Sequence, residues 1–243
     1  MLNYAWKGGN LDWIRDGADK PGSAQRFQYR EKPGARMKAG GEYWYTATFM
    51  LPSSVRSVSG YTLSTMDFKH HVNGHGSVPS VSFNFEHGYF SIVESIDSRW
   101  KCGSFRNVDG GQTAACDRTE NVGRIGRQRD YSNRWVQMVA HLRWSGDKGF
   151  VKIWVDGKPI FGFSGNTMQW GRQVEFKFGP YRHHMTGNPG NTTLYFSAVA
   201  KAKDCQGLGI GNCAVLASNP PKGGFQNVIG RDRWVANDFS SHK

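Results

Sequence analysis

The stretch "GFVKIWVDGKPIFGFSG", residues 149 to 165, contains two runs in which apolar and polar or small residues alternate. Alternation with a period of two is typical of a β-strand that has one face in a core. The dipeptide Asp156-Gly157 separates the runs, and Asp-Gly between alternating segments is a strong signal for a tight two-residue hairpin turn. The stretch therefore predicts two antiparallel strands in a sheet with one buried face.

The same alternation recurs along the chain, in residues 41–51, 61–71, 79–96, 134–144, 174–179 and 191–202. A last strand is predicted within "NVIGRDRWVA" (227–236), and one turn of helix in "LDWIRDGA" (11–18). Many short strands with few helices indicate a β-sandwich. We predict a single all-β domain over residues 1–243, a concanavalin-like jelly roll of two antiparallel sheets with a concave substrate groove.

Basic residues outnumber acidic ones, 31 to 19, which gives a formal charge of +12 and a pI near 9.7. Such a surplus favours a polyanionic partner. The Lys and Arg residues are dispersed, and no zinc-finger, RNA-recognition or helix-turn-helix pattern occurs, so a nucleic-acid partner is not expected. Apolar runs are too short to span a bilayer, and no membrane partner is expected.

The four cysteines lie at positions 102, 116, 205 and 213. Local pairing, Cys102 with Cys116 and Cys205 with Cys213, would close two polar, turn-rich loops. The alternative is four free thiols; the spacing does not suit a zinc site. Two disulfides indicate an oxidising compartment, so we expect a secreted or otherwise extracellular protein. "LNYAWKGGNLDW" at the start has no apolar signal core, so a signal would not be part of this sequence.

Three predicted strands carry polar residues opposite their apolar face. If Met66 and Phe68 point into the core, their alternating neighbours share the outer face. The outer residues are Gln28 and Arg30 on one strand, Asp67, Lys69 and His71 on the second, and Ser82 and Asn84 on the third. They suit a wet binding groove, or they are ordinary solvent-facing positions of an antiparallel sheet.

The hairpin, followed by "VEFKFGPYRHH" (174–184) and "TTLYFSAVAKA" (192–202), resembles the C-terminal half of the jelly-roll polysaccharide lyases of the alginate, glucuronan and heparin lyase types. The resemblance covers roughly residues 25–202. The K-x-G-x-Y element of that group matches Lys177, Gly179 and Tyr181, and its R-E element matches Arg30 and Glu31.

The group also has a Q-x-H element on a central strand, and here "MDFKHH" (66–71) departs from it. Aligned on the apolar middle residue, Asp67 and Lys69 take the Gln and His places. Shifted by two residues, Lys69 and His71 take them. Either Lys69 or His71 is therefore the candidate base.

The resemblance implies an endo-acting lyase that cleaves a uronic-acid polysaccharide, such as glucuronan or alginate, by β-elimination. The reaction needs a base for the C5 proton, an acid for the leaving C4 oxygen and donors that neutralise the carboxylate. We assign Tyr181 as the acid and Arg30 as the neutralising group. Substrate-binding residues would be Gln28, Asp67, Ser82, Asn84, Arg182 and His183. We expect no metal or other cofactor, and a monomer.

Two alternatives belong to other functional classes. A non-catalytic, lectin-like carbohydrate-binding domain would share the groove but would need no acid or base. A glycoside hydrolase would need two carboxylates about 5 to 10 Å apart. The local candidates, Glu94 and Asp97, are three positions apart on a predicted strand and therefore point to opposite faces.

Overall fold

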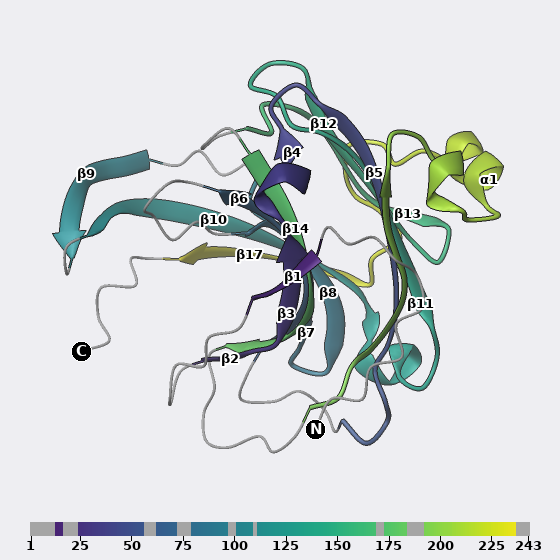
Figure 1. Ribbon diagram of the computed structural model, residues 1–243. Coiled ribbons are helices and arrows are strands. Elements are labelled where there is room, and N and C mark those ends of the chain that lie inside the picture. Colours follow the sequence, from purple (N-terminus) through teal and green to yellow (C-terminus); the bar gives the residue numbers. More distant parts are fainter. Residues whose placement is uncertain are drawn as a thin grey trace.

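The computed structural model describes residues 13–16, 24–55, 62–71, 79–96, 101–108, 111–168, 173–183 and 192–236. Almost all of this chain is β-structure arranged in two sheets (Figure 1). Within these ranges no helix is both long and apolar enough to cross a membrane. The predicted sandwich of two antiparallel sheets, of the jelly-roll class, is confirmed.

The larger sheet has eleven strands, with β1-β3-β14-β6-β7-β8-β10-β17 as its main order. Strands β2 and β4 also pair with β14, and β9 pairs with β10. The strands are β1 (Trp13–Asp16), β2 (Ala24–Arg26), β3 (Gln28–Glu31), β4 (Met37–Lys38), β6 (Thr62–His71), β7 (Pro79–Glu86), β8 (Tyr89–Glu94), β9 (Lys101–Val108), β10 (Gly111–Arg127), β14 (Gln173–His183) and β17 (Gly230–Ala236). β14 therefore lies between β3 and β6.

The second sheet has six strands in the order β15-β5-β11-β12-β13-β16. These are β5 (Glu42–Met50), β11 (Val136–Arg143), β12 (Gly149–Val155), β13 (Lys158–Gly165), β15 (Tyr195–Ala202) and β16 (Gly224–Phe225). The β12–β13 turn consists of Asp156 and Gly157, with φ of 49° and 74°. Positive φ at both central residues is the geometry that the Asp-Gly signal predicts.

An aromatic core joins the two sheets. Tyr45 and Phe49 of β5 are fully buried. Tyr45 makes an edge contact with Phe68 of β6 at 5.4 Å between ring centroids, and Phe49 makes one with Phe85 of β7 at 6.1 Å. Phe68 in turn packs on Phe176 of β14 at 4.9 Å. The apolar positions predicted to point inward on β6, β7 and β14 therefore do so.

The structure corrects the predicted helical turn near the N-terminus. Residues 13–16 form strand β1, whose register pairs Ile14 with Arg30. Pairing with β3 supplies backbone hydrogen bonds that outweigh a weak helical preference. Residues 79–96, predicted as one strand, form the hairpin β7–β8, with His87 and Gly88 at positive φ in its turn.

The C-terminal region contains the predicted disulfide Cys205–Cys213. It encloses a 3-10 turn, η3 (Gln206–Leu208), and leads into the short helix α1 (Cys213–Ser218), which the sequence analysis did not predict. For the other predicted pair, the β9–β10 register places Cys102 opposite Cys116, but these two side chains lie outside the described residues. The last strand, β17, is confirmed.

Gly179 is the point at which β14 passes close beside β3. Its φ is +119°, and an added Cβ would lie 2.4 Å from the carbonyl oxygen of Phe27 and 2.9 Å from Cα of Gln28. The register of β14 with β6 shifts between Phe178 and Tyr181, and the backbone N–H of Phe27 donates to the Pro180 oxygen at 2.8 Å. Only glycine meets both the φ value and the close approach.

We expect Gly179→Ala to lower the free energy of unfolding by about 1–3 kcal/mol, because alanine would be strained at this φ and would push β3 away. Chemical denaturation monitored by tryptophan fluorescence measures the change. Gly146→Ala is the control, since an added Cβ there meets nothing within 4 Å. Equal stability of the two variants would contradict this account of the β14–β3 contact.

Candidate active site

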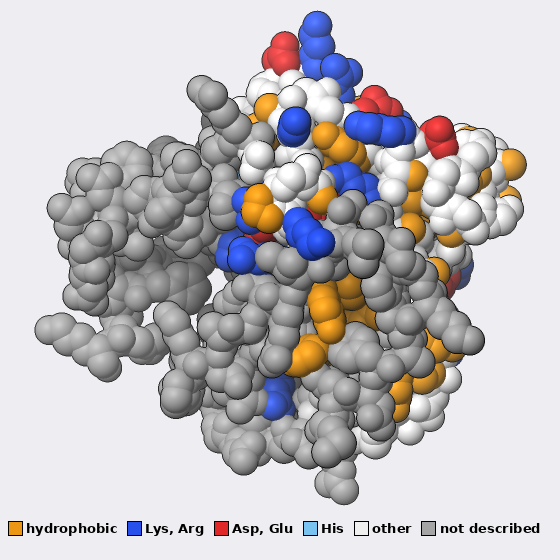
Figure 2. Space-filling model, viewed as in Figure 1, with side chains coloured by type: hydrophobic (Ala, Val, Ile, Leu, Met, Phe, Trp, Pro, Cys, Tyr) orange, Lys and Arg blue, Asp and Glu red, His pale blue; other side chains and the backbone are white. Residues whose placement is uncertain are grey.

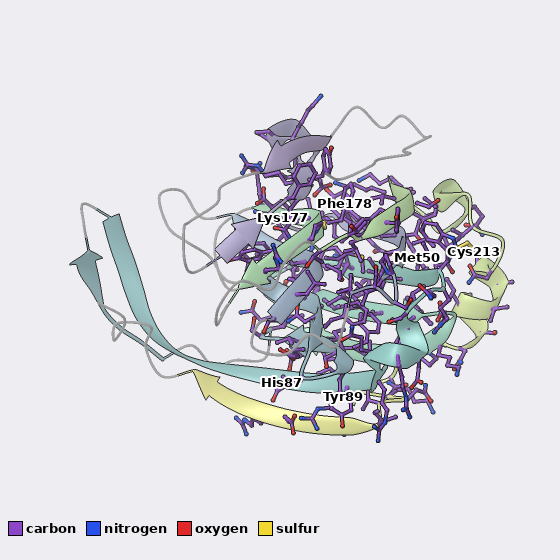
Figure 3. All side chains as sticks on the ribbon, turned by 90° about the horizontal axis from the view of Figure 1, so that it is seen from below. Met50, His87, Tyr89, Lys177, Phe178 and Cys213 are labelled. Carbon is purple, nitrogen blue, oxygen red and sulfur yellow. A yellow bond between two sulfur atoms is a disulfide. The ribbon has the colours of Figure 1, made fainter. Side chains whose placement is uncertain are left out.

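The outer face of the larger sheet carries a row of charged and polar side chains across four strands. Arg30 of β3 is opposite Lys177 of β14, Lys177 is opposite Asp67 of β6, and Asp67 is opposite Ser82 of β7. Directly opposed residues in an antiparallel sheet share one face. Figure 3 shows Phe178, the next residue after Lys177, directed into the packed interior, where it stacks on Tyr29 at 5.5 Å. Lys177 and its row therefore face away from the core.

Polar side chains on this face are buried, although they point away from the second sheet. Asp67, Lys177, Glu175 and Asn84 are each 5% exposed or less. Ordinary solvent-facing positions of an antiparallel sheet would be largely exposed. Their burial therefore favours a built polar site over the alternative that these are surface residues.

Cations exceed carboxylates in this cluster. Nζ of Lys177 lies 3.2 Å from Oε1 of Glu175, and Nε of Arg36 lies 3.1 Å from Oε2 of the same carboxylate. Lys69 is opposite Glu175 in the register of β6 and β14. Among the described side chains, four cationic ones (Arg30, Arg36, Lys69 and Lys177) thus share the region with two carboxylates (Asp67 and Glu175), and this positive excess suits an anionic ligand.

Asp67 lies at the centre of the site. Its Oδ2 accepts a hydrogen bond from Nε2 of Gln28 at 3.1 Å, although β14 lies between their strands. Gly179 of β14, which lies close to the backbone of Gln28, presents no side chain between these strands. Burial raises the pKa of the Asp67 carboxyl above its ordinary value, and the charges of Lys177 and Lys69 and the Gln28 bond oppose that rise.

Tyr181 belongs to the next row on the same face. It is opposite Ser64 of β6, and Ser64 is opposite Asn84 of β7. Because Asn84 alternates with the core residues Phe83 and Phe85, Asn84, Ser64 and Tyr181 all point outward. Tyr181 is half-buried, four positions along β14 from Lys177. The structure thus brings Tyr181, Arg30, Asp67, Ser82 and Asn84 to one face.

The two candidate bases lie farther along β6. Lys69 is half-buried and five positions from Ser64, the partner of Tyr181, which corresponds to roughly 16 Å along the strand. Lys69 and Tyr181 therefore reach one bound group only if both long side chains lean towards each other. His71 pairs with Gln173 still farther from Tyr181, and its side chain lies outside the described residues.

Arg182 is not brought to this face. Its partner in β6 is Leu63, a fully buried core residue, so Arg182 points to the opposite side from Tyr181. Its Nη1 donates to Oγ1 of Thr192 at 3.3 Å. The side chain of His183, the other predicted binding residue from this segment, lies outside the described residues.

His70 faces the core. Its Nε2 lies 3.1 Å from the Thr167 carbonyl oxygen and its ring meets Trp144 edge-on at 5.3 Å. Burial lowers the pKa of His70 to about 4, so the imidazole is neutral at pH 7 and supplies no charge to the neighbouring lysine.

Glu31 holds strand β3 in place from the inner face of the sheet, and the sequence analysis did not predict its contacts. The carboxylate is 1% exposed; Oε1 accepts from Tyr45 Oη and Lys201 Nζ, both at 2.8 Å, and Oε2 accepts from the Phe176 N–H at 2.9 Å. Burial raises the pKa of Glu31, against the opposing effect of Lys201. The only available signal was its position next to Arg30, which places it on the opposite face.

Glu94, the candidate carboxylate of a hydrolase, is engaged in structural bonds. Its Oε2 accepts from the Ile96 N–H at 2.9 Å and its Oε1 from Nδ2 of Asn121 at 2.5 Å. Asp97 lies outside the described residues. Nothing in the described chain therefore assembles Glu94 into a catalytic carboxylate pair.

Basic side chains gather around this part of the molecule. Figure 2 shows Lys and Arg side chains over the region of β4, β6 and β14, with a smaller acidic area among them. Among the described residues, no group of three or more His, Cys, Asp or Glu side chains is placed to hold a metal ion.

Comparison with known proteins identifies the family. The family model described as "Polysaccharide lyase" matches residues 10–200, and the chain belongs to this family, as the sequence resemblance predicted. No curated protein matches the chain.

Similar solved structures include alginate lyase AlyC3, with 13% identity, a TM-score of 0.49 and coverage of 78% of this chain and 74% of that one. A family 7 alginate lyase, A1-II', in complex with the substrate GGMG has 14% identity, a TM-score of 0.47 and coverage of 78% and 75%. Alginate lyase PA1167 from Pseudomonas aeruginosa has 16% identity, a TM-score of 0.44 and coverage of 78% and 80%.

The depressed pKa of His70 makes a prediction about acid stability. The pKa of His70 is 6.5 in the unfolded chain and about 4 in the folded protein. Between these two pH values the unfolded chain binds a proton at His70 and the folded protein does not. Stability is therefore lost as pH falls through this window, by roughly 3 kcal/mol from this residue. His70→Gln should flatten the fall in melting temperature between pH 7 and pH 4. A variant that tracks the wild-type profile would show that His70 is not the group responsible.

Proposed function

We propose that this polysaccharide lyase cleaves a uronic-acid-containing polysaccharide, such as glucuronan or alginate, by β-elimination. The observation that carries the proposal is the shared outer face: Arg30 projects from it directly beside the buried cation Lys177, and Tyr181 projects from it four residues farther along β14. A phenol that acts as the acid and a guanidinium that neutralises the carboxylate are two of the three groups that this elimination requires, and the base is the third.

Arg30 is the proposed partner of the uronate carboxylate. The C5 proton is alpha to that carboxylate, and its removal places more negative charge on the carboxylate oxygens. A guanidinium can bind both oxygens in a fixed geometry. Lys177, opposite Arg30, adds a second buried positive charge at the same place, so charge that develops there is stabilised in surroundings of low dielectric.

Tyr181 is the proposed acid. A base takes the C5 proton, the electron pair of the C5–H bond forms the C4–C5 double bond, and the C4–O bond breaks. The departing oxygen takes the phenol proton of Tyr181. In the alternative assignment Tyr181 has both roles for one sugar epimer: its phenolate takes the C5 proton, and the phenol so formed gives that proton to the departing C4 oxygen. The separation of Lys69 from Tyr181 favours that two-role assignment.

Tyr181→Phe should lose at least about 100-fold in turnover, the low end of what a positioned acid or base contributes. The phenylalanine ring keeps the packing and deletes only the proton, so the melting temperature should stay within about 2 °C of the wild type. The measurement is the ultraviolet absorbance of the conjugated C4–C5 double bond during incubation with alginate or polyglucuronate. Undiminished cleavage by this variant would remove Tyr181 from the mechanism.

The same assay distinguishes the candidate bases. If Tyr181 has both roles, as its separation from Lys69 favours, Lys69→Ala and His71→Ala should both fold and keep their activity. A folded but nearly inactive Lys69→Ala, with His71→Ala still active, would instead make Lys69 the base. Wild-type protein that binds these polymers without any rise in absorbance would instead support the lectin-like alternative.

A further inference from the structure

Among the described residues, three buried oxygen atoms on the outer face accept no hydrogen bond. One of them, Oε2 of Glu175, is compensated by Nε of Arg36 at 3.1 Å, which leaves two without a compensating cation or donor. Asp67 Oδ2 is satisfied by Gln28, but Asp67 Oδ1 has no hydrogen-bond partner among the described residues, and neither has Oδ1 of Asn84. Asp67 and Asn84 are 2% and 5% exposed. A buried acceptor without a donor costs about 1–3 kcal/mol, so such atoms are rarely left unsatisfied without a reason.

The two oxygens lie on neighbouring strands of the candidate site. Asp67 is opposite Ser82 on β7, and Asn84 is two residues farther along β7 on the same face. A ligand group that satisfies Oδ1 of Asp67 must be a donor, because an ionised carboxylate only accepts hydrogen bonds. Sugar hydroxyl groups are such donors.

The other side of the site carries cations instead of hydrogen-bond acceptors. Arg30 and Lys177 lie on β3 and β14, whereas the open acceptors lie on β6 and β7. Strands are spaced about 4.8 Å apart, so one uronate can present its carboxylate to the cations and its ring hydroxyls to the acceptors. The arrangement thus fixes which edge of the sugar meets which strand.

We infer, on the basis of the proposed function, that the substrate is a polyuronate whose ring hydroxyls at this edge are unsubstituted, and not a sulfated glycosaminoglycan. A free hydroxyl donates to Asp67 Oδ1. An acetyl ester has no proton to donate, and a sulfate ester in addition brings a negative charge against a buried carboxylate. The expected order of cleavage is therefore unmodified, then O-acetylated, then O-sulfated polymer.

The test uses alginate and polyglucuronate, each in unmodified, O-acetylated and O-sulfated form at matched chain length. Wild-type protein should cleave the sulfated form at least about 10-fold more slowly than its parent. Asp67→Asn removes the charge at nearly constant shape and offers an amide donor. It should therefore lower the ratio of the cleavage rate on unmodified polymer to the rate on sulfated polymer by at least about fivefold.

Glu42→Gln is the matched control. It removes one negative charge, as Asp67→Asn does, but from an exposed side chain of β5 in the other sheet. Because each variant loses one negative charge, any general attraction of the basic protein to sulfated polymer rises equally in both. Only Asp67→Asn should therefore change the ratio of the cleavage rates on unmodified and sulfated polymer. Asn84→Asp, which adds a carboxylate to the acceptor edge, should widen the ratio and provides a second test if Asp67→Asn does not fold.

Failure of this inference is distinguishable from failure of the proposed function. If wild-type protein cleaves sulfated and unmodified polymers equally well, or if the ratio is the same in Asp67→Asn and Glu42→Gln, the inference is wrong and the lyase activity stands. If no polymer is cleaved, the proposed function fails. Affinity electrophoresis in gels that contain the same six polymers then tests the same order and the same ratios through binding.

Discussion

The buried carboxylate of Glu31 is the interaction on which the position of the site depends. It accepts hydrogen bonds from Tyr45 of β5, Lys201 of β15 and the backbone of Phe176 in β14, and so joins both sheets at one residue. Breaking a buried ion pair by removing one partner typically costs about 3–5 kcal/mol. The adjacent Arg30 must point to the opposite face, where it meets Lys177. The Arg-Glu dipeptide thus combines an anchor on the inner face with the proposed carboxylate-binding group on the outer one.

Gly179 has a comparable dual effect. Its positive φ and its contact with Phe27 and Gln28 bring β3 against β14, and it presents no side chain between β3 and β6, whose residues Gln28 and Asp67 are hydrogen-bonded. Beyond Gly179 the register shifts before Tyr181, so the tyrosine enters the row that contains Ser64 and Asn84. In the K-x-G-x-Y element the glycine therefore sets the positions of groups on both sides of it.

Sequence periodicity was sufficient to predict the sandwich, the Asp156-Gly157 hairpin and the faces of β3, β6 and β7, because a period of two fixes which residues are buried. It could not predict β1, where pairing with β3 outweighs a weak helical signal, or the turn at His87 and Gly88 within one continuous alternation. Arg182 was expected beside Tyr181 because the two are neighbours in sequence. Neighbours on a strand point to opposite faces, and the register with β6 shows that Arg182 follows this rule.

The net charge of +12 indicates an anionic partner but says little about selectivity, because a face with only cations would attract every polyanion. Selectivity requires some repulsive or unsatisfied element against the wrong ligand. Within the described site, Glu175 is held by Lys177 and Arg36, which moderates the positive excess, whereas Asp67 keeps one oxygen open. A buried carboxylate in a basic site opposes the attraction of the cations to highly charged polymers. It would act where that attraction is strongest, close to the sugar ring. The cations would then determine that the ligand is an anion, and Asp67 would determine which parts of it must be neutral.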